Sequence, residues 1–147
     1  MEHVNISPEF FQRNLSTREE REDRVALIIE QQTFTRTMLQ RFLGLEFRIF
    51  TADAGKAGLV HYVNHVPDIT FINFNLPDMS GLEICKLLSK LDRKSHIVML
   101  DGENDTERTQ QALSSGAKSC IVKPYTRGKI QDAMALYFSQ IQTLEKS

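Results

Sequence analysis

Short apolar runs alternate with longer amphipathic stretches from residue 25 onward. The first run, VALII at 25–29, is uninterrupted and rich in β-branched residues, which is typical of a strand buried on both faces. Similar runs predict four more strands, at 46–50, 69–72, 96–100 and 118–122. Apolar residues at helical spacing predict helices at 33–43, between a cap at Asp53 and Pro67, at 82–91 and at 126–144. A polar stretch at 103–115, closed by Gly116, predicts one more helix, the fourth in chain order.

This alternation of strands and helices predicts an α/β fold. Parallel strands need crossover connections, so helices are expected on both faces of one parallel sheet. Because such crossovers are right-handed, the sheet is an open, doubly wound one. We expect residues 24–147 to form this single domain and residues 1–23 to form a separate arm or extra helix.

The segment before the domain has its own pattern. Ser7 followed by Pro8 is a helix-start signal, and Phe11 and Leu15 lie four residues apart on one helical face. Residues 18–24 (REEREDR) are all charged. The segment is therefore expected to be a helix or a solvated arm, with a disordered leader as the alternative. Its Phe11/Leu15 face is expected to dock on the domain or on a partner.

Composition excludes several classes of protein. The formal net charge of the 147 residues is -1, so no basic surface indicates nucleic-acid binding. No apolar run reaches the length of a membrane span, and the polar N-terminus is not a signal peptide, so we expect a cytoplasmic location and no membrane contact. Cys85 and Cys120 show no metal-ligand spacing and are expected to be reduced thiols.

Polar residues follow four of the predicted strands, at the edge where doubly wound sheets bind ligands. They are Glu30 and Gln31 after the first strand, Asn73 after the third, Asp101 after the fourth and Lys123 after the fifth. Acidic residues here would hold Mg²⁺, and a lysine with a hydroxyl would neutralise a phosphoryl group. However, the Asn73 amide is a poor nucleophile, Gln31 is neutral, and Asp101 would repel a phosphate. The set argues against phosphoryl transfer, and no cofactor is expected.

The remaining charges suggest an internal ion pair. Lys123 would be an unpaired cation if Asn73 were its only neighbour, so we expect Asp101 or Glu30 to supply the opposite charge. The alternative is that Asp101 faces solvent and caps the fourth helix.

The ordered segments VALIIEQQ, INFNLPDMSGLE, MLDG and CIVKPY resemble a response-regulator receiver domain of two-component signalling, over about residues 24–144. The resemblance implies a flavodoxin-like sheet with strand order 2-1-3-4-5. In that family an acidic pair follows the first strand, an Asp ending the third accepts phosphate, and a Ser or Thr ends the fourth. The matching positions here hold Glu30/Gln31, Asn73 and Asp101, so only Lys123 keeps its family role. Asn75 matches the residue whose carbonyl helps to bind the metal.

These departures favour a stand-alone pseudo-receiver that is not an enzyme and is not phosphorylated at Asn73. It would act through a protein partner, such as a histidine kinase, another regulator or a second copy in a homodimer. By resemblance, interface residues are expected at Arg108, Lys118 and Leu136. The Phe11/Leu15 face is a further expected interface. The alternative is a phosphorylation-dependent regulator with an unusual acceptor, such as the displaced Asp78. A small-molecule ligand in the crevice also stays open.

Two other features are of interest. His61 and His65 have a spacing that can hold a metal, but without a third ligand they favour an exposed polar face. Cys120 matches the family position of a switching aromatic residue. A small thiol cannot swing between packed and exposed states as a ring does, which argues against a conventional switch.

Overall fold

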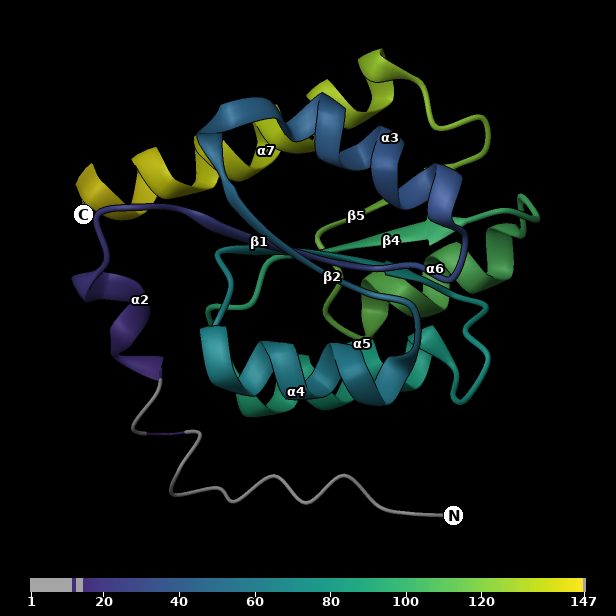
Figure 1. Ribbon diagram of the computed structural model, residues 1–147, viewed down its shortest axis with the longest axis horizontal. Coiled ribbons are helices and arrows are strands. Elements are labelled where there is room, and N and C mark those ends of the chain that lie inside the picture. Colours follow the sequence, from purple (N-terminus) through teal and green to yellow (C-terminus); the bar gives the residue numbers. More distant parts are fainter. Residues whose placement is uncertain (1–11, 13–14, 147) are drawn as a thin grey trace.

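Five strands form one parallel sheet in the order β2-β1-β3-β4-β5 in the computed structural model, which describes residue 12 and residues 15–146 (Figure 1). The strands are β1 (Val25–Ile29), β2 (Arg48–Ala52), β3 (Ile69–Asn73), β4 (Ile97–Asp101) and β5 (Ser119–Val122). The helices are α2 (Thr17–Glu20), α3 (Thr33–Leu43), α4 (Gly55–His65), α5 (Gly81–Leu91), α6 (Thr106–Ser114) and α7 (Arg127–Lys146), with a 3₁₀ turn η1 (Gly44–Glu46). The predicted doubly wound, flavodoxin-like architecture is confirmed.

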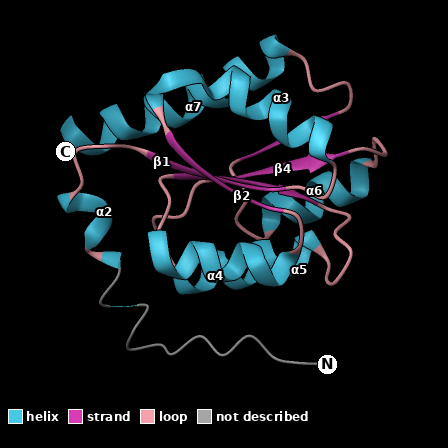
Figure 2. Cartoon of the chain, viewed as in Figure 1, coloured by secondary structure: helices cyan, strands magenta, loops and turns pink. Residues whose placement is uncertain are grey.

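Helices cover both faces of the sheet (Figure 2). One core cluster joins Leu39 of α3 and Tyr137 of α7 to Ile28 and Phe71 of the sheet. The other cluster joins the opposite sheet face to α4, α5 and α6. All five residues of β1 are buried, as expected for a strand covered on both sides. The predicted apolar stripe of the last helix also packs in the first cluster, with Ile130, Met134, Tyr137, Phe138 and Ile141.

The register of the strands brings the carboxyl ends together at one edge. Asn73 pairs with Leu100, and Asp101 pairs with Val122. At the first strand, the Glu30 N–H donates to the carbonyl of Ala52 at 2.9 Å. Glu30, Asn73, Asp101 and Lys123, which end or directly follow β1, β3, β4 and β5, therefore lie at one edge of the sheet, and this edge is called the crevice below.

Two elements begin two or more residues later than predicted. The second strand begins at Arg48 rather than at residue 46, because Gly44 ends α3 with a positive φ of 65° and the chain then makes η1. The fourth helix begins at Thr106 rather than at Glu103. The preceding loop is held by Asp101, and Asp105 caps the helix by accepting from the N–H groups of Glu107 and Arg108.

The predicted cap at Asp53 is also wrong, since Ala54 occupies the N-cap position of α4. The first N–H groups of this helix donate to a carboxylate from a distant loop. Asp78 accepts from Gly55 N at 2.7 Å and from Lys56 N at 2.9 Å. Local sequence cannot reveal this cap, because its donor and acceptor lie more than twenty residues apart.

The charged segment before β1 docks on the amino edge of the sheet, near the end of α7 (Figure 1). Arg18 makes a bidentate ion pair with the buried Asp92, with Nη1 3.2 Å from Oδ1 and Nη2 2.5 Å from Oδ2. Arg21 pairs with Asp68 at 2.7 Å, and Leu15 packs against the core. The expected docking of the Phe11/Leu15 face on the domain is confirmed for Leu15, whereas Ser7, Pro8 and Phe11 lie outside the described part.

Among the described helices, none combines the length and the apolar character needed to cross a bilayer.

Candidate functional site

Asn73 ends β3 with its side-chain amide held from both sides. Its Nδ2 donates to Oε2 of the buried Glu30, and its Oδ1 accepts from Asn75 N at 2.7 Å. The other oxygen of Glu30 accepts from Gln32 N at 3.1 Å. Each polar atom of the Asn73 side chain thus already has a protein partner, and both side-chain oxygens of Glu30 accept hydrogen bonds from N–H groups.

Asp101 ends β4 and is completely buried. Its Oδ1 accepts from Glu103 N at 2.9 Å and its Oδ2 from Asp105 N at 3.0 Å. Both sequence-based expectations for this residue are therefore wrong. Its carboxylate neither pairs with Lys123 nor faces solvent; it organises the loop before α6, while Asp105 caps the helix.

Lys123 directly follows β5 and is exposed, and its peptide bond to Pro124 is cis. Its side chain runs beside Gly102, since a Cβ on that glycine would lie 3.7 Å from Lys123 Cδ. Within residues 15–146, Lys123 makes no ion pair with Asp101 or Glu30, because both acids bond to N–H groups instead. Its ammonium is therefore exposed at the rim of the crevice.

Gln31, the neutral member of the would-be acidic pair, is exposed. Its main-chain carbonyl accepts from Arg36 Nη1 at 2.8 Å, as does the carbonyl of Glu30. Arg36 therefore fixes the turn between β1 and α3 through the backbone, without use of the Gln31 side chain.

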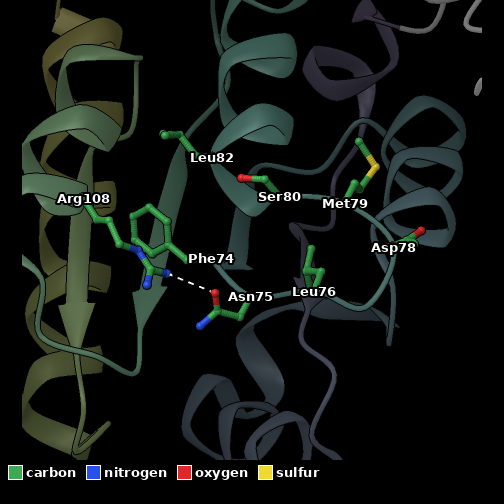
Figure 3. Close-up of a pocket in the computed structure, with 8 residues that line it drawn as sticks. All are labelled: Phe74, Asn75, Leu76, Asp78, Met79, Ser80, Leu82 and Arg108. Carbon is green, nitrogen blue, oxygen red and sulfur yellow. Dashed lines mark hydrogen bonds between the residues drawn. The ribbon is translucent and has the colours of Figure 1, made fainter.

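A cleft of about 470 Å³ opens beside this crevice, between the β3–α5 loop and α6 (Figure 3). Arg108 reaches across it, with its guanidinium carbon 4.3 Å from the centre of the Phe74 ring. Its Nη1 donates to Glu103 Oε2 at 2.6 Å, and its Nη2 to Asn75 Oδ1 at 3.5 Å. Asn75 Nδ2 in turn donates to Glu103 Oε1 at 3.3 Å. These three polar side chains form one closed network over the crevice.

Asp78 lines the far end of the same cleft (Figure 3). Burial alone would raise the pKa of its carboxyl, but the N–H groups of Lys56 and Gly55 outweigh burial and hold that pKa below its usual range. The carboxylate therefore ties the loop to α4.

Tyr125 lies under the crevice with a buried hydroxyl. Burial first, and then the negative charges of Glu30 and Asp101, raise the pKa of Tyr125. Within the described part of the chain, this hydroxyl has no hydrogen-bond partner. Sequence reasoning missed Tyr125, Glu103 and the role of Arg108; the only local signal was the position of Tyr125 directly after the Lys-Pro pair.

The residues expected at an interface line different hollows of the domain. Arg108 lines the cleft beside the crevice, whereas the exposed Lys118 directly precedes β5 at the opposite edge of the sheet. Leu136 is 37% exposed on α7, over β5. Leu15 packs on the core, and Phe11 is not among the described residues.

The two histidines of α4 stack with an aromatic ring. His65 lies 3.7 Å from Phe50, centroid to centroid, and His61 lies 5.6 Å from His65. Across residues 15–146, no three His, Cys, Asp or Glu side chains converge as a metal site. Cys85 and Cys120 are free thiols, as predicted, and Cys120 Sγ lies 3.6 Å from Thr109 Oγ1.

Comparison with known proteins identifies the family. Residues 26–135 match the model of the response regulator receiver domain. The chain is 26% identical over 110 residues to the chemotaxis protein CheY of Halobacterium salinarum, covering 74% of this chain and 92% of that protein. It is 27% identical over 111 residues to CheY of Bacillus subtilis, with the same two coverages of 74% and 92%.

A solved structure agrees with these relatives. A chain of the CheX-CheY-BeF3-Mg²⁺ complex from Borrelia burgdorferi superposes with a TM-score of 0.74 at 26% identity, covering 78% of this chain and 89% of that chain. Together with the strand order and the crevice at the carboxyl edge, the family match shows that this chain belongs to the response regulator receiver domain family.

Proposed function

We propose that this chain is a pseudo-receiver, which works in two-component-type signalling through protein contacts and takes no phosphoryl group in its crevice. The observation that carries the proposal is the bridging of the Asn73 amide between Glu30 and the Asn75 N–H. A phosphoacceptor needs a free, charged oxygen at this position, and the amide supplies neither. The protein is therefore a fixed signalling module and not an enzyme.

The donor set does not fit Mg²⁺. Magnesium prefers near-octahedral oxygen ligands, with one or two carboxylates. Here the only acid after β1 is Glu30, whose oxygens accept from Gln32 N and from Asn73 Nδ2. Asn73 turns a nitrogen donor toward that carboxylate, and Gln31 carries no charge. Binding of the ion would require these hydrogen bonds to break without a second carboxylate to replace them.

The surrounding charges also oppose a phosphoryl group. Asp101 places a buried carboxylate at the position where family members carry a hydroxyl, and Glu103 adds another carboxylate over the crevice. Repulsion of a phosphate from a partly buried carboxylate a few ångströms away costs on the order of a few kcal/mol. Arg108 carries the opposite charge, but it is already bound to Glu103 and Asn75.

Asp78 is the strongest alternative acceptor, but its two oxygens hold the N-terminus of α4. Phosphorylation would remove this cap and separate the loop from the helix. The alternative, a switch with an atypical acceptor, thus requires a local rearrangement that the pseudo-receiver does not need.

The output of such a module is binding. The similar structure from Borrelia burgdorferi is a complex of CheY with CheX, in which a receiver-like chain meets a protein partner. For this chain we propose a histidine kinase, another regulator or a second copy as the partner. The partner would bind the crevice loops in one conformation, which Asp101 and Arg108 hold. Binding would involve neither a membrane nor a nucleic acid.

Amide chemical shifts test the proposal. Addition of MgCl₂ and then of the phosphoryl mimic BeF₃⁻ should leave the amides near Glu30, Asn73, Asp101 and Lys123 unchanged. A variant with Gln31→Asp, Asn73→Asp and Asp101→Thr provides the matched reference, since it carries the family's residues at these positions. Shifts of the strand-end amides in the unmodified chain would refute the pseudo-receiver and support the atypical switch.

A further inference from the structure

The sheet ends in two edge strands, β2 and β5, which differ in how they are protected. At the β5 edge, Lys129 Nζ donates to the main-chain carbonyl of Val122 at 2.9 Å. A lysine on an edge strand is a common protection against pairing with another chain, as are proline and a bulge. β2 holds the five residues RIFTA, which include neither lysine nor proline, and its register with β1 has no bulge. The β2 edge therefore lacks these protections.

The hydrogen bonds between β2 and β1 show which groups of β2 face the sheet. Arg48 N donates to the Arg24 carbonyl at 2.7 Å, and the Ala52 carbonyl accepts from Glu30 N at 2.9 Å. In a parallel pair, alternate residues of a strand bond to the same neighbour. Arg48, Phe50 and Ala52 therefore bond to β1 through their main chain.

The two residues between them, Ile49 and Thr51, turn their N–H and C=O groups away from the sheet. Among the described residues, no main-chain or side-chain group forms a hydrogen bond with these four outward groups. A row of unpaired main-chain groups on an edge strand is a template for one further strand. The β2 edge is thus able to accept a strand from another chain.

The side chains beside this row are largely apolar or aromatic. Phe50 is half-buried and stacks on His65 with 3.7 Å between the ring centroids, while Ile49 packs on the opposite face of the sheet. The guanidinium carbon of Arg48 lies 5.2 Å from the centre of the Phe50 ring. Leu45, three residues before the strand, is fully exposed. An added strand would therefore cover apolar surface as well as main-chain groups.

A second copy of β2 matches the outward groups of the first. Ile49 and Thr51 lie one residue on either side of Phe50, so a two-fold axis at Phe50 sets Ile49 of each copy opposite Thr51 of the other. Each of these antiparallel pairs exchanges two N–H···O bonds, so that all outward groups of both strands are satisfied. The two Phe50 residues then form the close pair without hydrogen bonds, in which aromatic side chains interact favourably.

The charges at the two ends of β2 also suit antiparallel pairing. Arg48 begins the strand, and the exposed Asp53 directly follows it. The strand separates these two residues by roughly 16 Å, so they are too far apart to pair within one chain. Antiparallel pairing brings Arg48 of one copy beside the Asp53 end of the other. Glu46 and Lys56 add one acid and one base at the same two ends, so that neither end has a net charge.

We propose that the β2 edge joins two copies of this chain through antiparallel strands with a two-fold axis at Phe50. The two five-stranded sheets then form one continuous sheet. The proposal builds on the proposed function, since it selects a second copy as a partner. β2 carries none of the crevice residues, and the test uses neither phosphate nor Mg²⁺, so failure of either proposal would leave the other standing.

Sedimentation between about 10 µM and 1 mM tests the assembly, and the mass should rise from that of one chain toward that of two. Thr51→Pro removes an N–H group that does not bond to β1, and edge strands accept proline at such positions. Each dimer would lose two intermolecular hydrogen bonds, so the dissociation constant should rise about tenfold or more. Thr51→Val keeps the N–H group and should stay within about threefold of the natural chain.

Amide hydrogen exchange of the natural chain reports the register and needs no variant. Exchange at Ile49 and Thr51 should slow as the concentration rises, whereas the amides of Arg48, Phe50 and Ala52 should be protected at every concentration because they bond to β1. Unchanged exchange at Ile49 and Thr51 in a dimer would overturn the proposal. The mass of a single chain at about 1 mM would overturn it as well.

Variants at the strand ends and at the other edge locate the interface. Arg48→Asp should weaken the dimer about threefold or more, and addition of Asp53→Arg should restore it. A double variant weaker than Arg48→Asp alone would refute the antiparallel register. Leu136→Lys changes the surface over β5 and should leave the dissociation constant within about twofold. A dimer that Leu136→Lys abolishes and Thr51→Pro preserves would overturn the proposal in favour of the β5 edge.

Discussion

Replacement of Asp101 by alanine separates the two roles considered for this buried carboxylate. The structure shows two charge-assisted hydrogen bonds, to Glu103 N and Asp105 N, and no pairing with Lys123 in the described residues. The substitution would leave both N–H groups of the loop before α6 without an acceptor. Loss of a charge-assisted hydrogen bond costs about 1.5–3 kcal/mol, and water that enters the truncated site recovers part of it. We expect the free energy of unfolding to fall by about 2–4 kcal/mol.

Urea unfolding followed by circular dichroism measures this loss, and thermal unfolding should show a decrease of roughly 5–15 °C in Tm for a chain of this size. Lys123→Met is the matched control. Because Lys123 is exposed and unpaired with the acids, its removal should change the free energy of unfolding by less than about 0.5 kcal/mol. A neutral Asp101→Ala would refute the loop-anchoring role and would also exclude the ion pair. A Lys123→Met variant as unstable as Asp101→Ala, with a non-additive double variant, would instead restore the ion pair.

Three further predictions concern the frame of the molecule. Asp92→Asn should lower the free energy of unfolding by about 2–4 kcal/mol, because Asp92 accepts from Arg18 and from the buried Tyr62 hydroxyl. Burial would raise the pKa of Asp92, but Arg18 outweighs burial and lowers that pKa. The stabilisation is therefore present above about pH 4 and is lost as the pH falls further. Urea unfolding between about pH 3 and 6 measures this loss, and its absence would contradict a strong Arg18–Asp92 ion pair. Burial lowers the pKa of His96 to about 4, so as the pH falls the unfolded chain takes up a proton before the folded chain does. The free energy of unfolding should therefore fall by about 1–2 kcal/mol between about pH 6.5 and 4, and His96→Leu should remove this dependence. An NMR titration of His96 without a shifted pKa would contradict the prediction. Gly81→Ala should lower the free energy of unfolding by about 2 kcal/mol or more, because the new Cβ would overlap the Asn73 carbonyl. In the control Gly128→Ala the new Cβ meets nothing within 4 Å, so this variant should be neutral or stabilising. Equal melting temperatures for the two variants would exclude the close approach at Gly81.

The sheet and the location of the site follow from local pattern. Largely apolar runs at β1, β3 and β4 mark strands with both faces covered, and the rule for doubly wound sheets then places Glu30, Asn73 and Asp101 at one edge. These predictions succeed because burial and crossover handedness leave few arrangements. Strand order 2-1-3-4-5 came from the resemblance to receivers, and it is also confirmed.

The partners of individual side chains did not follow from the sequence. Lys123 and Asp101 have opposite charges on neighbouring strands, yet Asp101 bonds to the N–H groups of its own loop because they are nearer and must be satisfied. Asp78 caps a helix that starts more than twenty residues earlier, and Arg108 crosses to Glu103 and Asn75. Such choices depend on loop geometry, which no periodicity encodes.

The contacts of the charged arm could not be predicted from the sequence either. Seven consecutive charged residues at 18–24 were compatible with a solvated segment. Two of their arginines instead find the buried Asp92 and the half-buried Asp68, which lie far away in sequence. A run of charges therefore reveals a docked arm only once the acids that receive it are placed in space.

The central claim is that the strand-end crevice accepts no phosphoryl group, and mass measurement tests it most directly. The intact chain would be incubated with acetyl phosphate and MgCl₂ beside the variant that carries Gln31→Asp, Asn73→Asp and Asp101→Thr, and both would be weighed by mass spectrometry. We predict an unchanged mass for the natural chain. A stable, stoichiometric gain of one phosphoryl group by the natural chain would contradict the account.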